Sequence, residues 1–338
     1  MLRHLQFAAI AATLALAACS SSASSLGPTR PPHGTIVEFT VPTANAAPGS
    51  IVLGPDGNLW FLEDGESGSF ANQVAKITPT GVITEYPLGT INAFPANIVS
   101  GPDGNLWYVD EANHLGKVTT GGTVTLYPAT DPSSVAVGPD HNLWVTEFNG
   151  MKVDVYNTSG SLIHSYASNT NPSNLQLESI TAGPDGNMWF DTFSGDNVVK
   201  MVTGTGATST FTYSPTIQNT MRQITSGPDG NLWLCAQDDN NIAKITTAGA
   251  VTVYPIPSAN AKAFGIAAGP DGNVWFTEGG GNLPPAYVNK IGSITPSGTV
   301  TEYHVPTAQS GVTYITAGPG NTIWFTESLT DKVGELFL

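Results

Sequence analysis

Short apolar runs alternate with turn residues along the chain, and one phrase returns every ~40 to 50 residues, the spacing typical of a repeat array. In its clearest copy, residues 51–63, an apolar strand start is followed by Gly-Pro-Asp-Gly-Asn and then by Leu-Trp-Phe-Leu-Glu. Seven copies, the last one degraded, use all seven tryptophans of the chain. The copies begin at Gly54, Gly101, Gly138, Gly183, Gly227, Gly269 and Gly318. The pattern predicts seven structural units of one kind.

The sixth unit shows what one repeat contains. Residues 265–268, 273–278, 288–295 and 299–305 are short runs with strand character. Turn sequences with Pro and Gly separate the first two runs and the last two, since Pro presets φ and Gly accepts positive φ. Four antiparallel strands make one blade of a β-propeller. We therefore predict an all-β fold, a seven-bladed β-propeller of four-stranded antiparallel blades.

The two ends of the predicted propeller, residues 34–338, complement each other. The last unit lacks its fourth strand, whereas residues 34–42 read Gly-Thr-Ile-Val-Glu-Phe-Thr-Val-Pro and nearly repeat residues 298–306 of the sixth unit. We expect the N-terminal strand to complete the last blade, because ring closure removes exposed sheet edges.

The residues before the propeller have the features of an export signal. Residues 1–18 combine a basic start with a short apolar run and end in Leu-Ala-Ala, followed by Cys19. This pattern predicts a lipoprotein signal peptide, lipidation of Cys19, and a periplasmic or cell-surface location. The alternative is an ordinary signal peptide with an incidental cysteine. Residues 19–33 are rich in Ser and Pro and are typical of a flexible tether. The other cysteine, Cys235, is expected to be a small buried side chain.

The charge of the chain limits the classes of partner that it can bind. The formal net charge is −15, and such a surface repels phosphate backbones and anionic lipids. We therefore expect no nucleic-acid partner, and contact with a membrane only through the lipid anchor.

The variable connections between strands indicate which face carries function. The Gly-Pro-Asp-Gly turns hardly differ between copies, whereas the connections on the opposite face differ greatly, and variable loops on a rigid scaffold commonly carry function. On that face the two residues before the first apolar position of each innermost strand should line the channel mouth. These pairs are Gly49-Ser50, Ala96-Asn97, Ser133-Ser134, Glu178-Ser179, Arg222-Gln223, Phe264-Gly265 and Thr313-Tyr314.

Within these pairs, the predicted ligand-binding residues are Asn97, Glu178, Arg222, Gln223, Phe264, Thr313 and Tyr314. Glu178 and Arg222 belong to neighbouring blades and form either part of a ligand site or an ion pair on the solvated rim. Phe264 and Tyr314 would add aromatic surface for a small-molecule or protein ligand.

Acidic residues recur three positions after the tryptophan, at Glu63, Asp110, Glu147, Glu278 and Glu327. Because a repeated position is typical of scaffold, we expect most of them to cap loop amides. A divalent cation bound by Glu178 or Glu327 is the alternative.

The repeated phrase Ile-Thr-x-Gly-Pro-Asp-Gly-Asn-Leu-Trp-Phe-Thr-Glu, with Lys-Ile-Thr-x-x-Gly-x-Val-Thr-Glu-Tyr, resembles the virginiamycin B lyase family over residues 34–338. The resemblance implies Mg²⁺-assisted elimination across the ester C–O bond of a cyclic streptogramin. It also implies a histidine at the channel mouth in each of the last two blades, together with nearby glutamates.

This chain departs from that pattern. Phe264 and Thr313 stand at the two histidine positions, and Gly311 and Ser328 stand at the glutamate positions, although Glu327 adjoins the latter. Neither Phe nor Thr can act as a general base. We therefore expect a ligand- or partner-binding module without a resident cofactor. The alternatives are a divergent Mg²⁺-dependent lyase or lactone hydrolase using Glu178 or Glu327, and a structural cell-surface module.

Overall fold

The computed structural model describes residues 30–65, 72–90, 93–168, 176–192, 197–213, 221–279 and 288–338. The chain divides into two compact units, Met1–Pro31 and Pro32–Leu338. The described part of the chain contains no helix with the length and apolar character needed to cross a membrane.

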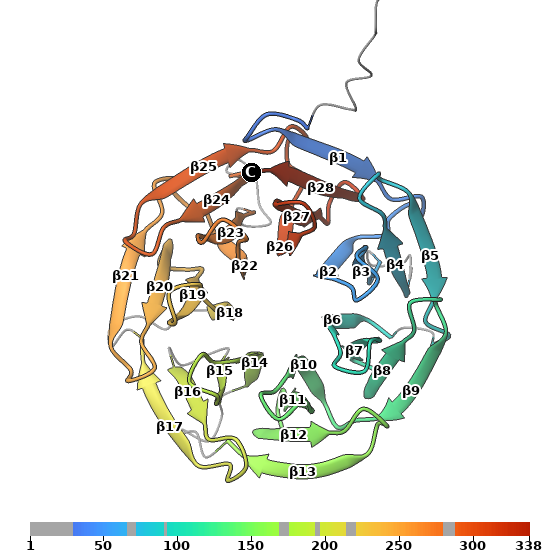
Figure 1. Ribbon diagram of the computed structural model, residues 1–338, viewed down its shortest axis with the longest axis vertical. Coiled ribbons are helices and arrows are strands. Elements are labelled where there is room, and N and C mark those ends of the chain that lie inside the picture. The colour runs from blue at the N-terminus through green and yellow to red at the C-terminus, as the bar shows by residue number, and fades with distance from the viewer. Residues whose placement is uncertain are drawn as a thin grey trace, which may run out of the picture. The chain divides into compact units, whose positions relative to one another are not determined.

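Within the second unit, the described residues form seven four-stranded antiparallel sheets arranged as the blades of a ring (Figure 1). The predicted seven-bladed propeller is therefore confirmed. Blades 1 to 3 contain β2 (Pro48–Leu53), β3 (Leu59–Glu63), β4 (Gln73–Ile77) and β5 (Ile83–Pro87); β6 (Pro95–Ser100), β7 (Leu106–Asp110), β8 (His114–Val118) and β9 (Val124–Pro128); and β10 (Pro132–Val137), β11 (Leu143–Glu147), β12 (Lys152–Tyr156) and β13 (Leu162–Ala167).

Blades 4 to 6 contain β14 (Leu177–Ala182), β15 (Met188–Thr192), β16 (Asn197–Met201) and β17 (Thr208–Thr212); β18 (Met221–Ser226), β19 (Leu232–Ala236), β20 (Asn241–Ile245) and β21 (Val251–Pro255); and β22 (Ala263–Ala268), β23 (Val274–Glu278), β24 (Lys290–Ile294) and β25 (Val300–His304). Blade 7 contains β26 (Val312–Gly318), β27 (Thr322–Glu327), β28 (Lys332–Phe337) and β1 (Ile36–Thr40).

Blade 7 joins the two ends of the propeller. β1 pairs with β28 in antiparallel register, from Ile36 opposite Leu336 to Thr40 opposite Lys332. The Phe39 ring also stacks on Trp324 of β27, two strands further inward, with ring centroids 5.6 Å apart. The predicted closure of the last blade by the N-terminal strand is confirmed.

The Gly-Pro-Asp-Gly-Asn turn owes its sequence to the tryptophan that follows it. In blade 1, Trp60 Nε1 donates to Asp56 Oδ1 at 3.0 Å, and Gly57 has φ +76°. A Cβ at Gly54 would lie 2.4 Å from Trp60 Cδ1, so glycine lets the indole cross the backbone. In the degraded last copy, Thr322 Oγ1 takes the place of the aspartate and accepts a hydrogen bond from Trp324 Nε1 at 3.0 Å. The turn aspartates are thus occupied in positioning the indoles.

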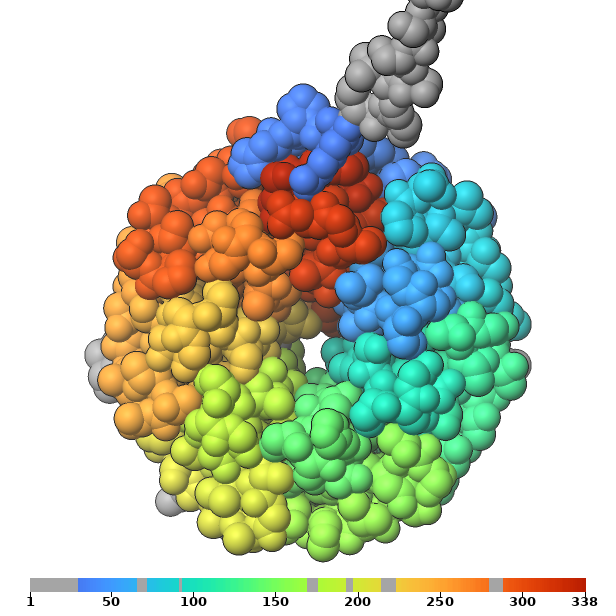
Figure 2. Space-filling view, in the orientation of Figure 1, coloured from blue at the N-terminus to red at the C-terminus, as the bar shows by residue number. Residues whose placement is uncertain are grey.

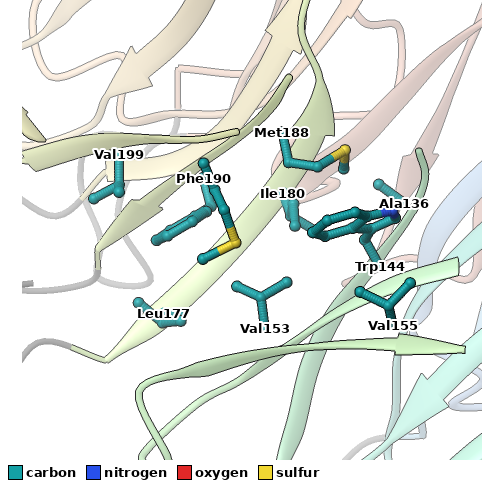
Figure 3. Close-up of a cluster of buried hydrophobic side chains, with 10 residues drawn as sticks. Ala136, Trp144, Val153, Val155, Leu177, Ile180, Met188, Phe190 and Val199 are labelled. Carbon is teal, nitrogen blue, oxygen red and sulfur yellow. The ribbon is translucent and has the colours of Figure 1, made fainter. Parts of the chain in front are cut away.

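Apolar side chains fill the space between neighbouring blades. Between blades 3 and 4, Trp144, Val153 and Val155 of one blade meet Ile180 and Phe190 of the other (Figure 3). Middle strands are buried on both faces because each sheet is covered on both sides. This continuous packing holds the innermost strands around the axis, where Figure 2 shows an opening.

Candidate ligand-binding site at the channel mouth

Each innermost strand begins with an irregularity in its pairing, such as the register shift between Leu177 and Ile180 in β14. A bulge of this kind re-aims side chains near a functional site. Beside these bulges lies a cavity of about 500 Å³, within the size range of small-molecule sites. Its lining residues are Ala96, Asn97, Glu111, Asp131, Pro132, Ser133, Ser134, Phe148, Glu178, Ser179, Gln223, Phe264 and Tyr314.

Five of the sequence-predicted binding residues line this cavity: Asn97, Glu178, Gln223, Phe264 and Tyr314. The rule that placed them, counting back from the first apolar position of each inner strand, therefore located the cavity wall. Their part in binding stays a prediction. The side chain of Arg222 and the whole of Cys19 lie outside the described residues, so the proposed pair of Glu178 with Arg222 and the lipidation both stay predictions as well.

Several of the lining residues also join one blade to the next. Along the described inner strands, a side-chain oxygen accepts a backbone N–H from the following blade at four places. The acceptor–donor pairs are Ser50 with Ile98 (3.2 Å), Asn97 with Val135 (3.0 Å), Ser179 with Ile224 (3.4 Å) and Gln223 with Ile266 (3.2 Å). Asn97 and Gln223 therefore have a structural role that sequence reasoning did not assign to them.

An aromatic pair forms the wall contributed by blades 6 and 7. The Phe264 and Tyr314 rings meet edge to face, with centroids 5.2 Å apart and planes at 76°. The Tyr314 hydroxyl donates to the Ala96 carbonyl of blade 2 at 3.5 Å, a distance at the limit of hydrogen bonding. The ring passes Gly49, where an added Cβ would lie 3.9 Å from it. Edge-to-face packing leaves an apolar surface with a polar rim.

Acidic side chains and a third aromatic ring, which sequence reasoning missed, contribute the wall of blades 2 and 3. Glu111 follows β7, Asp131 precedes β10, and Phe148 follows β11; all three line the cavity. Burial, with a smaller contribution from the Glu111 carboxylate, raises the pKa of the adjacent loop residue Asp64 to about 6. The loop face over blades 1 to 3 is therefore crowded with carboxyl groups.

The positions at which the family resemblance implies histidine and glutamate have other uses here. Thr313 does not line the cavity, and its hydroxyl lies 3.0 Å from that of Thr326. Gly311 has φ +66°, and a Cβ there would lie 2.6 Å from Leu329 Cγ. Ser328 Oγ donates to the Gly311 carbonyl at 3.0 Å. Gly311 and Ser328, joined by this hydrogen bond, therefore stand where the resemblance implies acidic side chains.

Glu327 is buried inside blade 7 and does not line the cavity. Burial, with the Glu38 carboxylate nearby, raises its pKa to about 7, although Ser310 and Lys332 lower it. The described residues contain no group of three or more His, Cys, Asp or Glu side chains able to hold a metal ion. Metal binding by Glu178 or Glu327 stays a prediction, tied to the lyase alternative.

The other recurrent acids are buried in the same way. Burial raises the pKa of both Glu63 and Glu278 to about 8. Asp110 accepts the backbone N–H of His114, the first residue of β8, at 2.9 Å, whereas neither carboxylate oxygen of Glu278 or Glu327 accepts from a backbone amide. The expectation that most of these acids cap loop amides is therefore not confirmed. None of these acids, and none of the described histidines, belongs to the cavity lining.

The chain is thus a seven-bladed β-propeller whose channel ends in a cavity lined by polar and aromatic side chains. The model of the virginiamycin B lyase family matches residues 15–171 and 163–337, and the chain belongs to this family.

Solved structures of family members are similar over nearly the whole chain. Virginiamycin B lyase from Staphylococcus aureus is 30% identical with a TM-score of 0.80, and the match covers 90% of this chain and 99% of that one. A streptogramin B lyase is 29% identical with a TM-score of 0.79, and the match covers 89% of this chain and 97% of that one. A catalytically inactive virginiamycin B lyase from Staphylococcus aureus with quinupristin is 29% identical, with a TM-score of 0.79. The match covers 90% of this chain and 99% of that one. No curated protein matches the chain.

Proposed function

We propose that this chain is an exported, lipid-anchored propeller that binds a ligand at the channel mouth and does not perform the elimination of its lyase relatives. The observation that carries the proposal is the cavity of about 500 Å³, in which aromatic and hydrogen-bonding side chains converge. A pocket of this composition is the usual form of a small-molecule site.

The loss of elimination follows from the residues at the implied catalytic positions. Elimination needs a base beside the proton to be removed. Phe264 offers an apolar ring, and the hydroxyl of Thr313 is engaged with Thr326. The cavity could still hold a substrate-like molecule, because binding and proton removal depend on different groups.

Quinupristin is the ligand to test first, because a solved structure of an inactive relative contains it. Purified protein spanning residues 32–338 would be titrated with quinupristin by calorimetry, with and without Mg²⁺. In parallel samples, the products would be separated by chromatography and their masses measured by mass spectrometry, with Staphylococcus aureus virginiamycin B lyase as the positive control. We expect saturable binding and no linear product.

Three outcomes would contradict the proposal. A linear product of unchanged mass, absent in Glu178→Gln or Glu327→Gln, means a divergent lyase; a product heavier by one water means a lactone hydrolase. Absence of binding to both quinupristin and a library of small molecules leaves the structural-module alternative.

Export and anchoring are tested separately from binding. The full chain expressed in a bacterium should take up radiolabelled palmitate and partition with membranes, and Cys19→Ala should lose both properties. Unchanged labelling of Cys19→Ala would refute the anchor.

A further inference from the structure

The cavity differs in chemistry from one side to the other. Glu111, Asp131 and Glu178 belong to blades 2, 3 and 4, whereas Phe264 and Tyr314 belong to blades 6 and 7. Since the blades follow chain order around the ring, carboxyl groups occupy one arc and the aromatic pair occupies the arc across the channel (Figure 1). A molecule that fills the cavity meets charge on one side and an apolar surface on the other.

The acidic arc is held in position by backbone contacts. The Asn149 backbone N–H and side-chain Nδ2 both donate to Asp131 Oδ2, at 2.7 and 3.0 Å. The backbone N–H of Glu111 donates to the Ala93 carbonyl at 2.9 Å, and that of Phe148 to the Asp131 carbonyl at 2.8 Å. These contacts fix the backbone at Glu111 and Phe148 and orient the Asp131 carboxylate, and all three residues line the same cavity.

Carboxylates beside an aromatic ring are the groups that attract an organic cation. A ring face draws an ammonium group electrostatically, and a carboxylate adds a direct charge interaction. The net charge of −15 and the crowding of Asp64 with Glu111 add negative potential on this face. An anionic ligand would be repelled from the same arc.

We propose that the cavity selects amphipathic organic cations, with the cationic group against Glu111, Asp131 and Phe148 and the apolar part against Phe264 and Tyr314. This inference rests on the proposed function, that the cavity binds a ligand, and adds the charge and orientation of that ligand.

Three probes of similar shape and different charge test the inference. They are 3-phenylpropylammonium, its neutral N-acetyl derivative, and the anion 4-phenylbutyrate, each titrated into residues 32–338 and followed by ligand-observed NMR. At low ionic strength we expect the cation to bind at least about tenfold more tightly than the neutral amide. Added salt should narrow that difference, because exposed charges are screened.

Two variants separate the two arcs. Glu111→Gln removes an exposed charge, and should weaken binding of the cation about threefold while leaving that of the amide unchanged. Phe264→Leu should weaken both. The matched control is Asp238→Asn, since Asp238 lies on the blade 5 loop, is paired with Lys262 at 2.8 Å and does not line the cavity; it should change neither affinity.

The outcomes distinguish this inference from the proposed function. Equal affinity for cation and amide, or tighter binding of the anion, overturns the charge assignment and leaves the cavity as a binding site. If none of the three probes binds while quinupristin does, the inference alone fails. If quinupristin and the library of small molecules also fail to bind, both the inference and the proposed function are wrong.

Discussion

At the scale of single residues, the turn aspartate bonds a tryptophan in two blades but has a lysine partner in only one of them. Trp107 Nε1 and Lys117 Nζ lie 3.0 and 2.7 Å from the Asp103 carboxylate. In blade 6, Asp271 accepts from Trp275 Nε1 at 3.0 Å, but Ser293 occupies the strand position of the lysine. Burial alone would raise the pKa of Asp103, yet hydrogen bonds from Lys117 and Trp107 lower it to about 2.

Because of the lysine, the turn aspartate of blade 2 should contribute more to the free energy of unfolding than the turn aspartate of blade 6. We expect Asp103→Asn to lower the free energy of unfolding by about 1 kcal/mol more than Asp271→Asn, because only the first change breaks a partly buried ion pair. Urea denaturation of both variants measures the difference. Equal losses would show that the indole bond is the whole contribution.

Thr322 offers a second test at this scale. Thr322→Val keeps the shape of the side chain but leaves the buried Trp324 Nε1 without its acceptor, so we expect a loss of about 1 to 3 kcal/mol in the free energy of unfolding. Thr301→Val, at an exposed position of β25, is the matched control. A loss no larger than the control's would contradict the assignment.

Prediction of the cavity-lining residues from sequence succeeded where the repeat continued into the cavity wall and failed where the repeat ended. Glu178 and Tyr314 fall within the two positions before an apolar run, so counting along the strand placed them on the wall. Glu111 and Phe148 lie in connections after the strands, which have no period. The interblade bonds of Asn97 and Gln223 were missed as well, because they depend on distances between blades.

At the scale of elements, the pairing of β1 with β28 is the least local contact of the ring. Deleting residues 34–42 exposes the edge of β28 and removes the stacking of Phe39 on Trp324, so we expect the melting temperature to fall by about 10 °C or more. Thermal melts followed by circular dichroism test this. Deletion of residues 20–29 is the control, and matching melting temperatures for the two deletions would contradict the role of β1.

The fold class and this closure were predictable because seven copies repeat one signal, and the missing strand was recognisable as a copy of another. The replacement of the turn aspartate by Thr322 was not predictable, since the degraded phrase does not reveal which oxygen meets the indole.

At the scale of the whole molecule, buried carboxyl groups should make the propeller sensitive to alkaline conditions. In the folded state the pKa of Glu63 and Glu278 lies at about 8, above the ordinary 4.5 expected after unfolding. Between these values the folded state holds protons that the unfolded state releases, so stability falls as pH rises through this window. The negative net charge acts in the same direction.

We expect the melting temperature to be higher at pH 5 than at pH 9 by about 5 °C or more. The double variant Glu63→Gln, Glu278→Gln should melt higher than the parent at pH 9 and show a flatter dependence on pH. The double variant Glu111→Gln, Asp238→Asn, which removes two surface charges, controls for net charge. A double variant with the slope of the parent would refute the role of these two carboxyls.

The pairing of Ile36 with Leu336 also sets an order of events in folding. Contacts within blades 1 to 6 join neighbours in the chain and can form blade by blade, whereas β1 has no partner until the last strand of the ring is present. Until then the chain keeps an unpaired strand and an unfinished seam. Folding of the ring is therefore completed when its first strand pairs with its last.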